Sequence, residues 1–170
     1  IPTTHRLSVG CAGNYAAPPA NQIVHEADLV FFIGCETGDQ VTHTWRIPAI
    51  DTPCVQIDID PTELGRSYPN TLGLMGDPKA TLAKLLLALG KPARDTAFAD
   101  RAAGMVAAWR EGRAPFLANN AVPIWPDRLC AEITRALPHD GILVADTGYS
   151  GIWSSTLIEL NGAGQTYLRA

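Results

Sequence analysis

The sequence lacks the features that mark a membrane protein or a binder of polyanions. Its longest apolar runs, Leu29–Ile33 and Leu85–Leu89, are far shorter than the roughly 20 residues that span a bilayer. No basic segment followed by an apolar stretch opens the chain, so no secretory signal is visible. The net charge is −4, which provides no basic field for nucleic acid or an anionic membrane. We therefore expect neither of these as a partner.

Cysteine and histidine do not occur at the spacings that bind metals. No pair of cysteines forms C-x-x-C, which speaks against structural zinc, and no pair of histidines has metal-ligand spacing. Cys54 lies in an apolar run and is expected to be a buried free thiol. The pattern favours a reduced, cytoplasmic setting. The residues concerned are Cys11, Cys35, Cys54, Cys130, His5, His25, His43 and His139.

The chain also lacks the usual signatures of a hydrolase. Ser150, in Tyr149-Ser150-Gly151, does not stand in a G-x-S-x-G elbow, and no Ser–His–Asp order can be argued. No pair of carboxylates stands out, because the remaining acids occupy positions where helices carry solvated carboxylates. These acids are Glu63, Asp77, Glu132 and Glu159. We predict that the chain is not a covalent hydrolase.

Apolar runs and helical patterns alternate over the first half of the chain. Strands are expected at 28–34, 54–60 and 71–75, because these are short apolar runs ended by glycine or proline. Helices are expected at 19–27 and 78–89, since prolines open the first turn of both, and leucines recur at helical spacing in the second. This alternation predicts an α/β, Rossmann-like domain with a parallel sheet over residues 1–90.

The pattern of residues in the sequence changes between positions 91 and 126. A linker at 91–94 precedes an Ala-rich amphipathic helix at 97–113, and the chain is then broken by Pro115, Pro123 and Pro126. A domain boundary is expected in this region.

A second α/β domain is expected to begin at about residue 127. Its expected elements are a helix to about 137, a strand at 142–145, a helix at 150–160 and a strand from 166. These are too few to bury a sheet on both faces. Since the chain also begins with Ile1 rather than Met, we expect it to be a piece of a longer polypeptide.

The turn after the strand at 142–145 is the sharpest candidate site. A strand that is apolar on both faces runs into small and hydroxyl residues, which suits an anionic group at the carboxyl end of a parallel strand. In this interpretation, Thr147 and Ser150 donate from their hydroxyls to phosphate, with Gly148 and Tyr149 between them. The alternative is a strand-to-helix turn whose small residues only fit the geometry.

Glycines and acids also follow the expected strands of the first sheet. The carboxyl ends of parallel strands lie along one edge, where a carboxylate can bind ribose hydroxyls and a glycine can approach a pyrophosphate. The candidate residues for nucleotide binding are Gly13, Gly34, Asp58, Asp60, Gly76 and Asp77. The alternative is structural, since G-x-x-G is not G-x-G-x-x-G and Asp58 or Asp60 can cap the turn at Pro61.

Three of these segments, taken in order, resemble the central domain of thiamine diphosphate-dependent enzymes, and most closely the acetolactate synthase group. An acidic-Ala-Asp strand, an Ile-Asp-x-Asp-Pro strand end and a Gly-Asp strand end recur there in the same order. In this sequence they are Glu26–Gly34, Val55–Glu63 and Leu74–Asp77. The segment Asp127–Gly151 resembles the start of that family's diphosphate-binding domain. The likeness covers about residues 7–90 and 123–170.

The resemblance implies a cofactor, a substrate class and an assembly. Members have three domains and form their active sites between two subunits, so a homodimer or homotetramer is expected. The implied substrate is a 2-oxo acid, and the implied cofactors are thiamine diphosphate and Mg²⁺. Residues Thr147, Gly148, Tyr149 and Ser150 would match the turn that touches thiamine diphosphate.

Several parts that the resemblance leads us to expect lie outside this sequence. The activating glutamate should precede Ile1, and the Gly-Asp-Gly…Asn magnesium motif should follow Ala170. Gly76-Asp77-Pro78 is not that motif, because its third residue is proline and it belongs to the first sheet. The opening strand and helix of the central domain are missing as well. We expect no catalysis from these 170 residues alone.

FAD or ADP occupies the central domain in some members. Here Glu36 stands where the acetolactate synthases usually carry an arginine, and a carboxylate repels a pyrophosphate. A vacant site is therefore favoured. Two other readings stay open: a stand-alone nucleotide- or FAD-binding flavoprotein module, and a sirtuin-like deacylase. The lack of paired C-x-x-C motifs argues against the deacylase.

Overall fold

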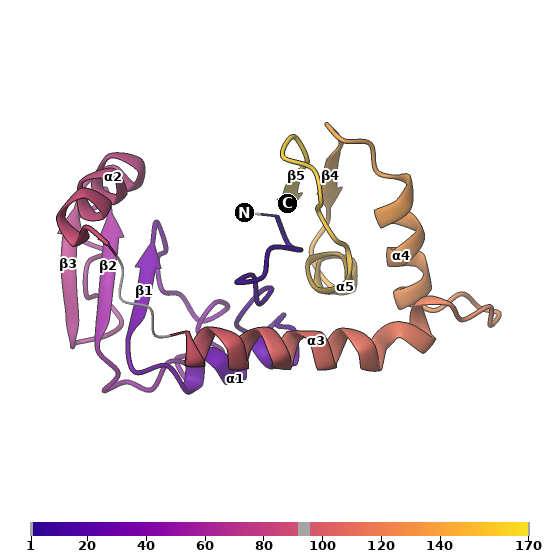
Figure 1. The fold of residues 1–170 in the computed structure, drawn as a ribbon, viewed down its shortest axis with the longest axis horizontal. Helices are drawn as coiled ribbons and strands as arrows, with labels where there is room; N and C mark the ends of the chain where they lie inside the picture. The colour runs from indigo at the N-terminus through magenta and orange to yellow at the C-terminus, as the bar shows by residue number, and fades with distance from the viewer. Residues whose placement is uncertain (1, 92–95, 170) are drawn as a thin grey trace. The chain divides into compact units, whose positions relative to one another are not determined.

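The computed structural model describes residues 2–91 and 96–169. It confirms the α/β class, since the described residues form helices and two parallel sheets (Figure 1). The strands of the first sheet follow one another along the chain with no helix between them. The described residues form two compact units. The first-sheet unit holds residues 12–14 and most of 21–96, and the second-sheet unit holds 15–20 with most of 1–11 and 97–170. The division falls within helix α1 (Pro18–His25).

Three parallel strands form the first sheet, in the order β1 (Val30–Ile33), β2 (Cys54–Asp58), β3 (Thr71–Met75). The register pairs Ile33 with Ile57 and Ile57 with Leu74. The carboxyl ends of all three strands therefore lie along one edge of the sheet. Each strand falls within the range expected from its apolar run. The ends were predictable because a glycine or a proline closes each run in the sequence.

One face of the first sheet is covered by the segment that connects β2 to β3. Tyr68 is 1% exposed, and its ring lies 5.6 Å from that of Phe32. Gly73 also lies under this segment, and a Cβ there would crowd Leu64 at 3.2 Å. Gln56, also 1% exposed, donates to the carbonyl of Cys35 and accepts from the N–H of Gly65. This buried amide ties two loops to the central strand.

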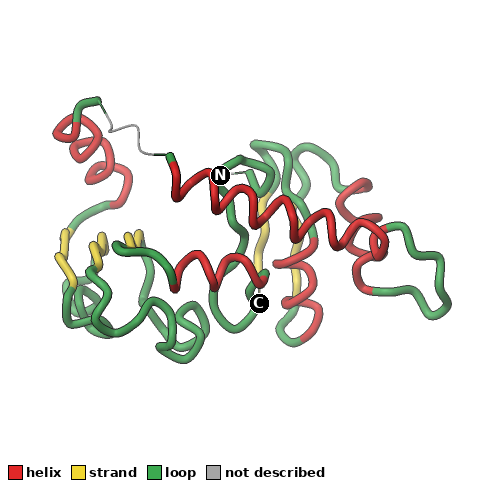
Figure 2. Tube along the Cα trace, turned by 60° about the horizontal axis from the view of Figure 1, so that its bottom comes forward, coloured by secondary structure: helices red, strands yellow, loops and turns green. Residues whose placement is uncertain are grey.

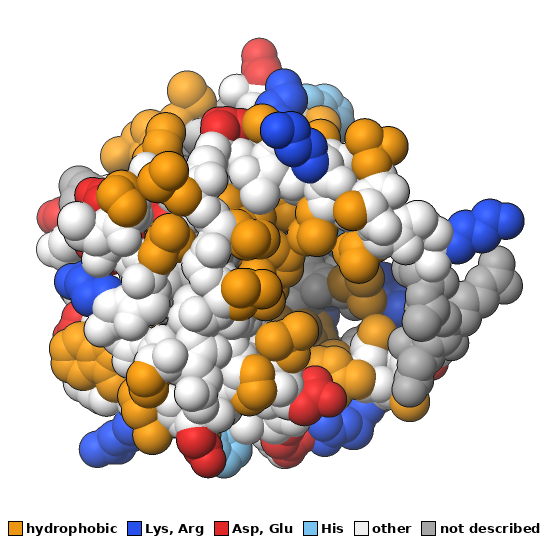
Figure 3. Space-filling model, turned by 90° about the vertical axis from the view of Figure 1, so that its left-hand side faces the viewer, with side chains coloured by type: hydrophobic (Ala, Val, Ile, Leu, Met, Phe, Trp, Pro, Cys, Tyr) orange, Lys and Arg blue, Asp and Glu red, His pale blue; other side chains and the backbone are white. Residues whose placement is uncertain are grey.

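Helix α2 (Pro78–Leu89) packs against β2. It begins at Pro78 because Asp77 caps it and proline suits the first turn. No residue of α2 is fully buried. Figure 3, which views the molecule from the side of β3 and α2, shows hydrophobic side chains spread over this face. The large exposed apolar side chains of these two elements are Leu72, Met75, Leu86, Leu87 and Leu89.

The second-sheet unit has two parallel strands, β4 (Ile142–Ala145) and β5 (Thr166–Arg169). Three helices accompany them: α3 (Ala97–Leu117), α4 (Pro126–Ala136) and α5 (Tyr149–Leu157). The start of the chain lies beside the end of α5, where the Thr3 hydroxyl and the backbone of Leu160 exchange hydrogen bonds. Strand residues remain half open to solvent, with Ile142 62% and Val144 66% exposed.

Pro115 does not break the chain, which corrects the expectation from the sequence. Helix α3 continues through it to Leu117, and Figure 2 shows the helix as one continuous coil. Pro115 has no N–H to donate to the carbonyl of Glu111, so α3 loses that one intrahelical bond, and the bonds of the neighbouring residues continue the helix for two more residues. Residues 92–94 of the linker expected at 91–94 lie outside the described residues.

The described elements carry no candidate membrane span. Among residues 2–91 and 96–169, no helix combines the length and the apolar character needed to cross a bilayer. Cys54 is a buried, unpaired thiol, as expected, and burial raises its pKa. Cys130 is buried and unpaired as well, and burial also raises its pKa.

The amide of Gln56 should contribute measurably to stability. In Gln56→Leu, the Cys35 carbonyl and the Gly65 N–H lose their partner, so we expect the free energy of unfolding to fall by about 1–3 kcal/mol. Urea titration followed by circular dichroism measures this. Gln22→Leu, on the exposed side of α1, is the control and should change stability by less than about 0.5 kcal/mol. Equal losses in both variants would contradict the assigned role.

Candidate functional site

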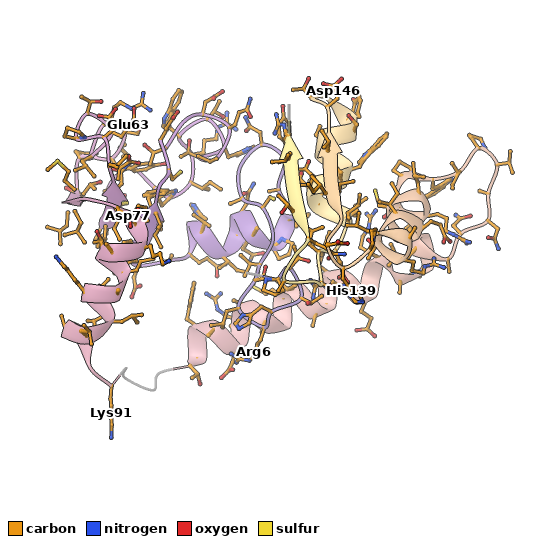
Figure 4. The ribbon with its side chains drawn as sticks, turned by 90° about the horizontal axis from the view of Figure 1, so that it is seen from above. Arg6, Glu63, Asp77, Lys91, His139 and Asp146 are labelled. Carbon is orange, nitrogen blue, oxygen red and sulfur yellow. The ribbon has the colours of Figure 1, made fainter. Side chains whose placement is uncertain are left out.

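The turn between β4 and α5 lies at the carboxyl edge of the second sheet. Gly148 opens α5 with φ +79° and ψ −150°, and no side chain caps the helix. The N–H groups of the first turn of α5 therefore remain available to an acceptor, as at any uncapped helix start. Thr147 and Ser150 are exposed beside them. Figure 4 labels Asp146, the residue that follows β4.

Hydrogen bonds within this turn fix its shape. The N–H of Thr147 donates to the carboxylate of Asp146 at 2.7 Å. The Ser150 hydroxyl donates to the carbonyls of Asp146 and Thr147, at 3.2 and 3.1 Å. The Ser150 proton is thus already used by the turn, whereas the Thr147 hydroxyl lies on the surface. Gly151 is required, because a Cβ there would lie 2.8 Å from the Asp146 carbonyl oxygen.

Arg169 is a residue of this site that sequence reasoning missed. It is the last residue of β5, and the parallel register places it beside Ala145, the last residue of β4. Its Cδ and Nε lie 3.5 Å from the position of a Cβ on Gly151. Its guanidinium lies 4.7 Å from the centre of the Tyr15 ring. A basic residue at the expected end of a parallel strand was the available signal.

An aromatic pair stands next to the turn. The rings of Tyr149 and Trp153 stack with their centres 5.4 Å apart, one turn apart on α5. Both are exposed, Tyr149 by 72% and Trp153 by 40%. The site therefore combines an open helix start, a guanidinium and an exposed apolar surface.

The first sheet brings three of its candidate residues together. Gly34, Asp58 and Gly76 follow or end neighbouring strands, and their backbones are hydrogen-bonded across the sheet. The N–H of Gly34 donates to Ile57 at 2.8 Å, and the N–H of Gly76 donates to Asp58 at 2.9 Å. Gly76 also has a packing role, since a Cβ there would lie 2.9 Å from the Thr81 hydroxyl.

Two of the candidate acids accept hydrogen bonds from nearby residues of their own turns. Asp60 accepts from the hydroxyl and the N–H of Thr62 at 2.7 and 2.8 Å, and these bonds hold the pKa of its carboxyl below its usual value. Asp77, labelled in Figure 4 at the start of α2, accepts from the N–H of Ala80 at 2.8 Å. Both contacts are those of turn and helix caps.

Gly13 is explained by a close contact in the same unit. A Cβ at this position would lie 1.9 Å from the carbonyl oxygen of Gln40, so only glycine fits. The side chain of Asn21 accepts from the N–H of Gly13 and donates to its carbonyl. Gly13 therefore packs against the loop that follows β1.

That loop, residues 34–41, encloses an open hollow of about 370 Å³. Glu36 and Asp39 contribute carboxylates to its lining. Thr37 is 1% exposed, and its hydroxyl has no hydrogen-bond partner among the described residues. Arg66 reaches the loop and donates to the carbonyl of Glu36 at 2.6 Å. The residues that line the hollow thus include two acids, and one cation is its neighbour.

A second cavity, of about 120 Å³, lies in the second-sheet unit. Its walls come from α3, from the end of α5 and from the N-terminal segment, and they include Val106, Trp109 and Ile158. It is mostly apolar and is not lined by the turn after β4. Within the described residues, no three side chains of His, Cys, Asp or Glu come together as a metal-binding group.

Substitution of Gly148 should destabilise the protein more than any other change in this turn. Its combination of φ and ψ belongs almost only to glycine, so Gly148→Ala should destabilise the second-sheet unit by about 1–3 kcal/mol. Gly104→Ala is the matched control: it lies inside α3 with open space around it and should stabilise by about 0.5–1 kcal/mol. Thermal unfolding of both variants measures the difference. A gain in stability for both variants would contradict the claim that only glycine adopts the backbone conformation at 148 without strain.

Comparison with known proteins identifies the family. Residues 1–85 match the family model described as the thiamine pyrophosphate enzyme, central domain. A probable 2-ketoarginine decarboxylase of Pseudomonas aeruginosa is 35% identical over 147 residues, 86% of this chain and 25% of the relative. The acetolactate synthase large subunit of Lactococcus lactis is 30% identical over 157 residues, 90% and 26% respectively.

A probable acetolactate synthase large subunit of Methanococcus aeolicus is 23% identical over 165 residues, or 90% of this chain. The matches to this relative and to that of Methanocaldococcus jannaschii span 28% and 15% of those proteins' lengths, so the chain corresponds to a minor part of its relatives. The matched half of the sequence, together with these relatives, shows that the chain belongs to the thiamine pyrophosphate-dependent, acetolactate synthase-like enzymes.

Proposed function

We propose that this chain is part of a thiamine diphosphate-dependent lyase or carboligase that acts on a 2-oxo acid. It would supply much of the central domain (residues 1–90), a connecting helix (91–126) and the start of the diphosphate-binding domain (127–170). The observation that carries the proposal is the uncapped start of α5 behind Gly148, in a chain of this family. The names of the relatives, acetolactate synthases and a 2-ketoarginine decarboxylase, support the substrate class.

The turn after β4 fits a diphosphate. The helix start offers N–H donors, and its dipole favours negative charge. Gly148 leaves open space, since a Cβ there would meet nothing within 4 Å. Thr147 would add a hydroxyl, and Tyr149 and Ser150 would add backbone N–H groups. When bound, thiamine diphosphate supplies a nucleophilic carbon that attacks the oxo acid and stabilises the charge left by decarboxylation.

The protein's own contribution in this segment is to bind and orient. The bonds from Thr147 and Ser150 into the turn keep its backbone in one conformation before any ligand arrives. Preorganised donors lose little entropy on binding, which is why such a turn holds a ligand in one geometry. Mg²⁺ would require ligands beyond this turn, and a catalytic site shared between two subunits would require a second copy.

The first sheet is proposed to hold no FAD or ADP. Glu36 and Asp39 line the hollow after β1, while Asp60 and Asp77 are engaged with their own backbone. A pyrophosphate placed there would face carboxylates. The Arg66 guanidinium would attract a pyrophosphate, but it is paired with Glu63 at 2.8 Å.

The alternatives from other classes find less support. A stand-alone flavoprotein module or a sirtuin-like deacylase would use the first sheet as its nucleotide site, and the relatives reported above are named as enzymes of neither class. A thiamine diphosphate-dependent enzyme would account for both sheets, the first as part of its central domain and the second as the start of its diphosphate-binding domain.

Activity is expected to depend on a longer polypeptide. The 170-residue chain, given thiamine diphosphate, Mg²⁺ and pyruvate, should release no CO₂ above the background without enzyme. The full coding sequence should turn over pyruvate or another 2-oxo acid. Turnover by the short chain alone would refute the first expectation, and inactivity of the full protein on a panel of 2-oxo acids would refute the proposed function.

Flavin binding is expected to be absent. Titration of FAD with the protein should leave the flavin fluorescence unchanged, because the hollow after β1 presents carboxylates to the pyrophosphate. Glu36→Gln is the informative variant, since it removes one carboxylate without changing shape. A yellow protein that retains flavin through gel filtration would contradict this part of the proposal and favour the flavoprotein alternative.

A further inference from the structure

Arg169 carries an inference about the turn after β4 that goes beyond the family assignment. The chain pairs β4 and β5 in parallel, so the last residues of the two strands, Ala145 and Arg169, lie side by side. The turn begins at the next residue, Asp146. The guanidinium of Arg169 therefore lies at the edge of the sheet where α5 begins without a side-chain cap.

Two neighbours hold the Arg169 side chain at this place. The Tyr15 ring lies under the guanidinium at 4.7 Å, a distance at which a cation is attracted by the aromatic face. Gly151 is the second neighbour, and its missing side chain leaves room for the Cδ and Nε of Arg169, 3.5 Å from where a Cβ would stand. A larger residue at 151 would crowd both the arginine and the Asp146 carbonyl.

Two positive groups lie at the turn, the Arg169 guanidinium and the start of α5. Within residues 145–151 and 166–169 the charged side chains are those of Asp146 and Arg169, and the Asp146 carboxylate accepts from the N–H of Thr147. The start of α5 adds the positive end of a helix dipole. Guanidinium groups bind carboxylates and phosphates through two parallel hydrogen bonds, which gives direction as well as affinity.

We propose that Arg169 binds an anionic oxygen of the ligand at this turn. The inference rests on the proposed function and assigns to the site a specificity residue. Two ligand groups share the required chemistry: a phosphoryl oxygen of the diphosphate and the carboxylate of the 2-oxo acid. Tyr15 acts as a positioning residue, because it touches the guanidinium and orients it.

The test uses the full-length enzyme and measures binding as well as rate. The variants are Arg169→Gln and Arg169→Lys, with Arg135→Gln as the matched control. Arg135 is an exposed arginine of α4 that pairs with Glu132, away from the turn. Quenching of tryptophan fluorescence, to which the exposed Trp153 contributes, gives dissociation constants for thiamine diphosphate, thiamine and an unreactive acyl phosphonate.

A lost charge-assisted hydrogen bond should weaken binding by about 10- to 100-fold. If the anion is the diphosphate, Arg169→Gln weakens thiamine diphosphate by this factor and leaves thiamine unchanged. If it is the substrate carboxylate, thiamine diphosphate binds normally and the acyl phosphonate is weakened, with a matching rise in KM and little change in kcat. Arg169→Lys should recover part of the loss, since it keeps the charge without the fork.

Tyr15→Leu separates a positioning role from a fold effect. It should weaken the same ligand as Arg169→Gln, but by only a few-fold, because the charge remains while its orientation is loosened. Circular dichroism of each variant checks that the fold is kept.

The inference is overturned if Arg169→Gln folds and binds all three ligands as the wild type does. That outcome leaves the proposed function standing. A wild-type enzyme that binds neither thiamine diphosphate nor the phosphonate overturns the proposed function and this inference together.

Discussion

Parallel pairing is the constraint on which the candidate sites depend. In an antiparallel pair, the end of one strand meets the start of the next, and the residues that follow two strands are far apart. Here β1, β2 and β3 run in one direction, as do β4 and β5, so each sheet has a single edge at which all its strands end. Gly34, Asp58 and Gly76 meet at one such edge, and Asp146 and Arg169 meet at the other.

The two edges use their polar groups differently. At the first sheet, Asp60 and Asp77 satisfy the backbone of the turns in which they stand, and Gly13 and Gly76 make room for neighbouring atoms. These groups stabilise the fold and have little left for a ligand. At the second sheet, Gly148 leaves the first turn of α5 uncapped. An edge with unsatisfied donors can accept an anion, whereas an edge that satisfies itself has little to gain from one.

Much of the fold was predictable from the sequence, because strands such as β3 and β4 are apolar runs bounded by glycine, proline or polar residues. The continuation of α3 through Pro115 was not, because a proline removes one intrahelical bond and the pattern of residues does not reveal whether the neighbouring bonds continue the helix past it. The residues around Asp146 were predicted as a candidate site from their small side chains. Arg169 and Tyr15 were not, because their contact joins positions that are distant in sequence.

The unpaired side of β1 has a consequence for how this chain behaves among other proteins. The strand reads Val-Phe-Phe-Ile, and among the described residues it hydrogen-bonds only to β2. It carries no charge, proline or bulge, the usual guards against strand addition from a foreign chain. Backbone donors and acceptors along it are a template for cross-chain pairing. A neighbour that covered this side of β1 would also protect the chain from aggregating.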